Sequence, residues 1–129
     1  MIAVKKKRVL IVDDEVHFTR LLKLNLERNG RYEVEEENRG AQALAAARKF
    51  KPDLVLLDIV MPDSSGNEIA AQLREDPELK GIPIIFITAI LSREEVTGMG
   101  GGLIGGHRFL AKPVKIEEVL ACLEQSPEK

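Results

Sequence analysis

The sequence lacks tryptophan and has one tyrosine and one cysteine among 129 residues. With Cys122 alone, no disulfide can form within the chain, which indicates an intracellular, cytoplasmic protein. Scarce aromatic side chains and a net charge of −2 argue against direct nucleic-acid binding. No apolar run approaches the roughly 20 residues of a membrane span, and no signal-peptide pattern opens the chain. The sequence therefore predicts no membrane association.

What is present is typical of a folded globular domain. Hydrophobic residues make up 44% of the chain and charged residues 31%, in the ordinary range for such domains. The length suits one domain with a proper core, and neither an internal linker nor a repeat interrupts it. We therefore expect residues 1–129 to form a single domain.

One stretch organises the rest of the chain. Four apolar residues, Leu54 to Leu57, lead directly into Asp58, and Pro62 opens a loop shortly afterwards. A short apolar run bounded by turn signals predicts a strand buried on both faces, as in the centre of a parallel sheet. Asp58 then lies at the carboxyl end of that strand, where open α/β sheets bind their ligands. Packing does not explain an acidic residue at the end of a buried strand, whereas a chemical role for its carboxylate does.

Strand and helix patterns alternate along the chain. Apolar or alternating runs predict strands at residues 9–12, 31–37, 53–58, 82–87 and 107–111. Helical spacing predicts helices at residues 15–29, 40–50, 67–75, from Arg93 onward, and around 116–123. Six glycines from Gly98 to Gly106 make the fourth of these helices short or irregular. This order predicts a five-stranded parallel sheet with helices on both faces.

Polar side chains follow four of these strands. They are Asp13 and Asp14, Asp58, Thr88, and Lys112. In a parallel sheet the carboxyl ends share one edge, so we expect these groups to converge. Asp13 and Asp14 could instead cap the first helix, where acids suit the helix dipole. Three converging carboxylates need more positive charge than one lysine supplies, which favours Mg²⁺.

A carboxylate beside Mg²⁺ and an ammonium group is suited to attack phosphorus and form an aspartyl phosphate. Thr88 would then offer a hydroxyl, and Lys112 a positive charge, to the phosphoryl oxygens.

This constellation resembles the receiver domain of two-component response regulators over roughly residues 7–125. The likeness rests on Asp13-Asp14-Glu15 after an apolar strand, on Asp58 with Met61-Pro62 and Gly66, on Thr88-Ala89, and on Phe109 before Lys112-Pro113. The resemblance implies the flavodoxin-like, doubly wound fold with strand order 2-1-3-4-5.

The resemblance also implies a role for each residue. Asp58 is the phosphoryl acceptor, and Asp13, Asp14, Asp58 and the backbone carbonyl of Val60 hold Mg²⁺. Thr88 and Lys112 contact the phosphoryl group, Thr88 and Phe109 form a switch, and the bond before Pro113 is cis. The donor is a phosphohistidine on a sensor histidine kinase or a phosphotransfer protein, not His17 or His107. Such a domain is an acceptor rather than an enzyme, with at most slow autodephosphorylation.

Two departures from the family pattern are visible. The glycine-rich residues 98–106 replace a regular helix next to the usual output face, which predicts an unusual mode of output. Val60 and Ile90 are apolar where the family tunes water access, which predicts slow loss of the phosphoryl group.

Other functions stay open at this point. The main alternative is a receiver-like interaction module that works without phosphorylation. A flavodoxin-like FMN protein would want a phosphate loop where Asp13-Asp14-Glu15 stands, and an aspartyl-phosphate hydrolase would want D-x-D after its first strand. We expect a complete single-domain regulator, as a monomer or a phosphorylation-dependent dimer, whose protein target the sequence does not name.

Overall fold

A central sheet organises the computed structural model, which describes residues 5–89, 103–104 and 107–125. Its parallel strands are β1 (Lys7–Val12), β2 (Tyr32–Glu37), β3 (Leu54–Asp58), β4 (Ile84–Thr88) and β6 (His107–Ala111). Their spatial order is β2-β1-β3-β4-β6. This confirms the predicted parallel sheet of order 2-1-3-4-5.

A sixth short strand, β5 (Leu103–Ile104), pairs antiparallel with β6 at the edge of the sheet. The sequence analysis did not predict it, because two residues among glycines carry no strand periodicity. The helix predicted from Arg93, and most of the glycine-rich residues 98–106, lie outside the described residues.

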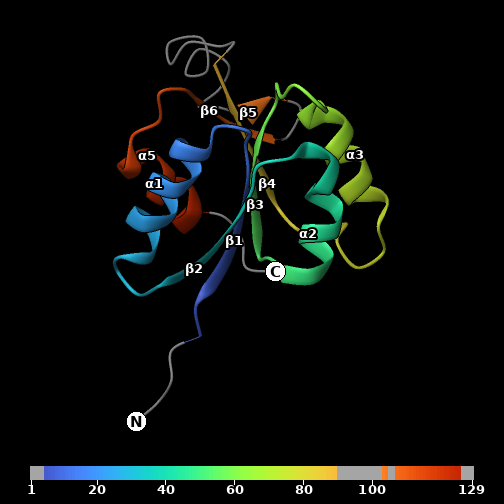
Figure 1. Ribbon diagram of the computed structural model, residues 1–129. Coiled ribbons are helices and arrows are strands. Elements are labelled where there is room, and N and C mark those ends of the chain that lie inside the picture. Colours follow the sequence, from blue (N-terminus) through green and yellow to red (C-terminus); the bar gives the residue numbers. More distant parts are fainter. Residues whose placement is uncertain (1–4, 90–102, 105–106, 126–129) are drawn as a thin grey trace.

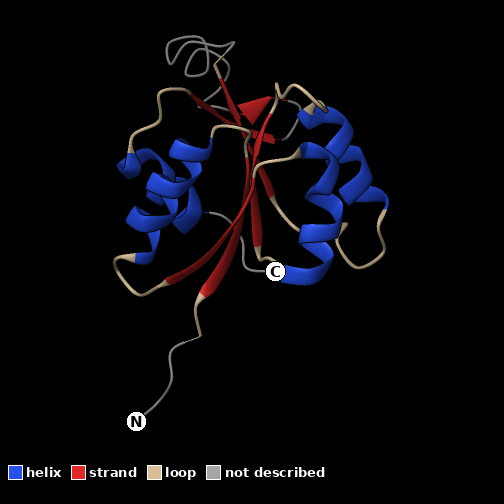
Figure 2. Cartoon of the chain, in the orientation of Figure 1, coloured by secondary structure: helices blue, strands red, loops and turns tan. Residues whose placement is uncertain are grey.

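Helices cover both faces of the sheet. On one face lie α1 (Val16–Glu27) and α5 (Ile116–Gln125); on the other lie α2 (Ala43–Phe50) and α3 (Gly66–Glu75) (Figures 1 and 2). A short 3₁₀ turn, η1 (Gly40–Gln42), leads into α2. Among the described residues, no helix is long and apolar enough to cross a membrane.

The central strands β3 and β4 are apolar on both sides because each side faces a helical layer. Leu54 to Leu57 are completely buried. Alternate residues enter two cores: Leu54 and Leu56 pack on the side of α1 and α5, and Val55 and Leu57 on the side of α2 and α3. The uninterrupted apolar run of β3 is thus the signature of its central position, and Asp58 is the first residue to break it.

Helix α3 begins directly after the loop that follows Asp58. Its N-cap, Ser65, accepts a hydrogen bond from the backbone N–H of Glu68 at 3.2 Å. The next residue must be glycine, since a Cβ on Gly66 would lie 2.5 Å from the carbonyl oxygen of Asp58. The start of α3 and the end of β3 therefore hold each other in place.

We expect Ser65→Ala to lower the free energy of unfolding by about 1 kcal/mol, because it removes the N-cap acceptor of α3. Urea denaturation followed by circular dichroism measures the loss. Ser64→Ala is the matched control, since Ser64 precedes the cap and should change stability less. Equal losses in the two variants would contradict a capping role.

Candidate functional site

Four parallel strands end at one edge of the sheet, the upper edge in Figure 1. Asp13 follows β1, Asp58 ends β3, Thr88 ends β4, and Lys112 follows β6. The register keeps these ends level, because Asp58 pairs with Ile87 on β4. The fold therefore brings together residues that are up to a hundred positions apart in the chain.

The three aspartates form a cluster of carboxylates. One oxygen each from Asp13, Asp14 and Asp58 lies within 4.8 Å of the others. Asp13 is completely buried and Asp58 is only 4% exposed, while Asp14 is half-buried. Three acids this close, two of them buried, repel one another unless positive charge is present.

The backbone and side chain of Asp13 are fixed by several hydrogen bonds. Its N–H donates to the carbonyl of Glu37 at 3.1 Å, and its Oδ1 accepts from the N–H of Glu15 at 2.9 Å. The side-chain amide of Asn38 donates to the Asp13 carbonyl at 2.7 Å and to Thr19 Oγ1 at 3.0 Å. These contacts make Asp13 a rigid part of the site.

Asn38 and Thr19 were not predicted from the sequence as part of the site. Asn38 follows β2 directly, so the rule that polar residues after parallel strands meet at one edge could have found it. Thr19 lies in the first turn of α1 and donates to Glu36 Oε1 at 2.8 Å. No pattern in the sequence distinguishes Thr19 from an ordinary helical residue.

Lys112 supplies positive charge to the cluster. Its Nζ lies 2.8 Å from Asp13 Oδ2 and 3.7 Å from Asp58 Oδ2, and it also contacts Glu15 Oε1. The same Nζ lies 5.0 Å from the centre of the Phe18 ring, a cation–π distance. No role at this site was predicted from the sequence for Glu15 or Phe18.

The backbone of Lys112 is also held in place. Its N–H donates to the carbonyl of Thr88 at 2.8 Å, which ties the end of β6 to the end of β4. The peptide bond between Lys112 and Pro113 is cis.

Burial and charge shift the pKa values in this cluster. Burial, followed by the charge of Asp13, raises the pKa of Asp58 to about 6, although Lys112 opposes the rise. Burial likewise raises the pKa of Asp13. Burial disfavours the charge of Lys112, but hydrogen bonding with Asp13 and Glu15 and the charges of Asp13 and Asp58 outweigh it, so the pKa of Lys112 is raised. The cluster thus holds more negative charge than Lys112 can balance.

The remaining predicted residues surround this cluster. Thr88 is buried at the end of β4. Val60 is 57% exposed, and its N–H lies 3.4 Å from Asp58 Oδ1. Phe109 is half-buried and stacks on Phe86 with ring centres 5.0 Å apart. Ile90 lies outside the described residues.

The donor set fits a hard divalent cation. Asp13, Asp14 and Asp58 offer only oxygen ligands, within 4.8 Å of one another, and Mg²⁺ prefers carboxylate oxygens together with waters and phosphate. Among the described residues, Lys112 is the one side-chain cation in ion-pair contact with these acids. A second positive charge would oppose the burial and the repulsion by Asp13 that together raise the pKa of Asp58.

Comparisons with known proteins agree with this site. The family model described as "Response regulator receiver domain" matches residues 9–124. Protein PilH of Pseudomonas aeruginosa is 39% identical over 116 residues, which cover 90% of this chain and 93% of PilH.

A longer relative and a solved structure also resemble this chain. The alkaline phosphatase synthesis transcriptional regulatory protein PhoP of Bacillus subtilis is 38% identical over 115 residues, but this chain spans only 46% of its length. The structure of the Vibrio cholerae chemotaxis protein CheY4 superposes with a TM-score of 0.77 at 30% identity, over 94% of this chain and 98% of that one.

Proposed function

Because the chain belongs to the response regulator receiver domain family, we propose that Asp58 accepts a phosphoryl group from a phosphohistidine on a sensor histidine kinase or phosphotransfer protein. Receiver domains are phosphoryl acceptors rather than enzymes in the usual sense. The observation that carries the proposal is the surroundings of Asp58, a strand-end acid 4% exposed beside two carboxylates and one ammonium group.

In the proposed transfer, one carboxylate oxygen of Asp58 attacks phosphorus. The phosphorus–nitrogen bond to the donor histidine breaks, and the imidazole nitrogen leaves with the electron pair. The product is an acyl phosphate on Asp58. Asp13, Asp14, Asp58 and the carbonyl of Val60 would hold Mg²⁺, which when bound neutralises charge that develops on the phosphoryl oxygens.

Lys112 and Thr88 complete the proposed site. The ammonium group of Lys112, 3.7 Å from Asp58 Oδ2, is near enough to bond an oxygen of a phosphoryl group carried there. Thr88 ends the strand next to β3 and would donate its hydroxyl to another oxygen. We propose that Thr88 and Phe109 then move together, and that the change at β6 alters the protein-binding surface.

We also propose that the phosphoryl group on Asp58 is lost slowly and that the domain works in the cytoplasm. Val60 places an apolar, 57% exposed side chain beside the acceptor, and such a side chain orients no water for hydrolysis, so the phosphoryl group leaves slowly. Residues 7–125 act as one receiver domain in the cytoplasm, where Cys122, which forms no disulfide, stays reduced. Its output goes to a protein, from a monomer or a dimer formed on phosphorylation, without direct nucleic-acid binding.

Acetyl phosphate tests the proposal, because its phosphorus–oxygen bond can break in place of the phosphorus–nitrogen bond of the natural donor. We expect intact-mass spectrometry to show one added phosphoryl group with Mg²⁺ and none with EDTA. Hydroxylamine should remove the group, as it does any acyl phosphate. Borohydride reduction followed by peptide mapping should place the group on Asp58.

An adduct on another residue, or one that forms equally in EDTA, would contradict the proposed chemistry. A folded protein that takes up no phosphoryl group would favour the alternative, a receiver-like interaction module that works without phosphorylation. A circular dichroism spectrum of the same sample shows whether the protein is folded.

A further inference from the structure

Two carboxylates other than Asp58 hold the ammonium group of Lys112. Its Nζ lies 2.8 Å from Asp13 Oδ2 and in direct contact with Glu15 Oε1, whereas Asp58 Oδ2 is 3.7 Å away. The contact with Glu15 is a hydrogen bond, the contact with Asp13 is a close ion pair, and the distance to Asp58 is too long for a hydrogen bond. Lys112 is therefore held mainly by the acids of the β1–α1 loop, and its ion pair with the acceptor Asp58 is the longest of the three contacts.

The two partners of Lys112 differ in burial. Asp13 is completely buried, whereas the side chain of Glu15 is 59% exposed. Separating Lys112 from Asp13 would leave a buried charge without its partner, which is costly. Glu15 can turn into water at small cost, because exposed ion pairs are weak. Glu15 is thus the partner that Lys112 can release.

We propose that Glu15 is a positioning residue that holds Lys112 back from Asp58 and thereby slows phosphoryl transfer. The inference rests on the proposed function, because Lys112 has to approach the phosphoryl group only if Asp58 accepts one. Lys112 then leaves Glu15, keeps Asp13, and bonds a phosphoryl oxygen. Glu15 sets part of the barrier to that movement without touching the reacting atoms.

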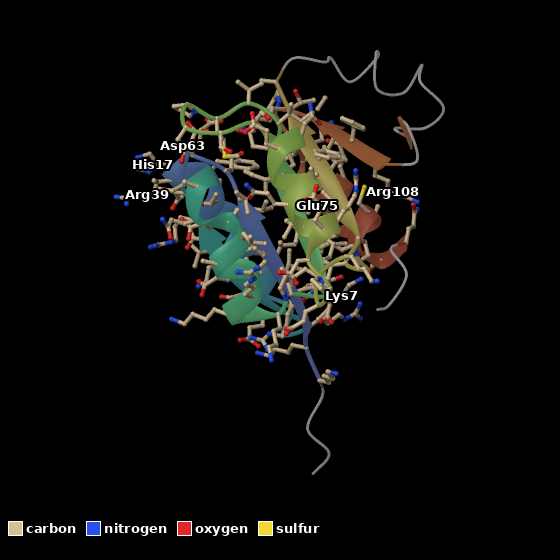
Figure 3. All side chains as sticks on the ribbon, turned by 90° about the vertical axis from the view of Figure 1, so that its right-hand side faces the viewer. Lys7, His17, Arg39, Asp63, Glu75 and Arg108 are labelled. Carbon is tan, nitrogen blue, oxygen red and sulfur yellow. The ribbon has the colours of Figure 1, made fainter. Side chains whose placement is uncertain are left out.

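Two variants of Glu15 separate its contact from its charge. Glu15→Gln removes the charge, while Glu15→Asp keeps the charge on a side chain one methylene shorter, which draws it away from Lys112. With acetyl phosphate and saturating Mg²⁺, we expect both variants to form the adduct about two- to fivefold faster than the wild type, as the release of a weak ion pair allows. Glu75→Gln, at the exposed C-terminal end of α3 (Figure 3), removes the same charge elsewhere and should keep the wild-type rate.

The effect must also depend on Lys112. In a Lys112→Ala background, Glu15→Gln should no longer change the rate, since there is no ammonium group to release. Persistence of the increase in that background would overturn the inference, because Glu15 would then act only by repelling the anionic donor. A wild-type rate for Glu15→Asp beside a faster Glu15→Gln would overturn it for the same reason.

A readout without phosphoryl transfer completes the test. In a crystal structure of metal-free Glu15→Gln, Lys112 Nζ should move to within about 3.2 Å of Asp58 Oδ2, a hydrogen-bond distance; an unchanged position would overturn the inference. If the wild type forms the adduct and the variants match its rate, the inference alone fails. If the wild type forms no adduct, the proposed function fails and the inference fails with it.

Discussion

Asp58→Asn is expected to abolish the phosphoryl adduct and, in metal-free protein at pH 8, to increase the free energy of unfolding by about 3 kcal/mol. The first effect follows because an amide cannot form the acyl phosphate. The second follows because burial, followed by the charge of Asp13, raises the pKa of Asp58 from 3.8 to about 6. The surroundings of Asp58 therefore disfavour its ionised form, and asparagine removes the charge while keeping the shape of the side chain.

The pH dependence has a defined sign. Between about pH 4 and 6 the folded protein keeps a proton on Asp58 that the unfolded chain has lost. The wild type therefore loses stability relative to Asp58→Asn as the pH rises through this window. Below about pH 4 the two proteins should differ little, and above about pH 6 the difference should be constant. Urea denaturation in EDTA at pH 4, 5, 6, 7 and 8 measures it.

Asp63 offers a control of opposite sign. Hydrogen bonds from the backbone N–H groups of Ala41 and Gly40 lower the pKa of Asp63. Asp63→Asn should therefore destabilise the protein at neutral pH, and the loss should disappear as the pH falls below the pKa of Asp63.

Two outcomes would contradict the prediction for Asp58. Equal stability of wild type and Asp58→Asn at pH 8 would show that the site does not disfavour an ionised Asp58. An adduct on Asp58→Asn would show that another residue is the acceptor.

The sequence predicted the parts of this molecule that repeat regularly along the chain. The apolar run Leu54 to Leu57 indicated a buried central strand because only such a strand is covered on both faces. Once the strands were parallel, their carboxyl ends had to share one edge. The meeting of Asp13, Asp58 and Lys112 could therefore be predicted without coordinates, and the structure shows these side chains together.

Features that depend on a single side-chain conformation were not predictable. Glu15 could point into water or toward Lys112, and only the coordinates show the contact. Phe18 repeats at helical spacing like any core residue, so its contact with Lys112 could not be predicted from the sequence.

Two strand boundaries also differ from the prediction. The strand β5 has two residues, too few for a period of two to appear. The strand β4 starts at Ile84 rather than residue 82, because Pro83 has no N–H to donate.

Lys112→Ala is expected to lower the free energy of unfolding of the metal-free protein by about 3 kcal/mol at pH 8, because it leaves a buried acid without its cation. Lys112 is 13% exposed and its partner Asp13 is completely buried. Excess Mg²⁺ should restore much of the loss, since bound cation supplies positive charge to the same acids and stabilises only the folded state. Urea denaturation with 10-fold steps of Mg²⁺ and with EDTA measures both effects.

Lys7→Ala is the matched control for this prediction. Lys7 begins β1, at the opposite end of the sheet from Asp63 (Figure 3), and its Nζ donates to the carbonyl of Leu123 at 2.9 Å. This variant loses a lysine and a hydrogen bond of its own, so it should be destabilised by the same amount with Mg²⁺ and with EDTA. If Mg²⁺ failed to distinguish Lys112→Ala from Lys7→Ala, Lys112 would be held by packing alone. A clear distinction would mean that Lys112 balances the charge of the acids in the metal-free state. The bound cation and the lysine would then neutralise the same carboxylates.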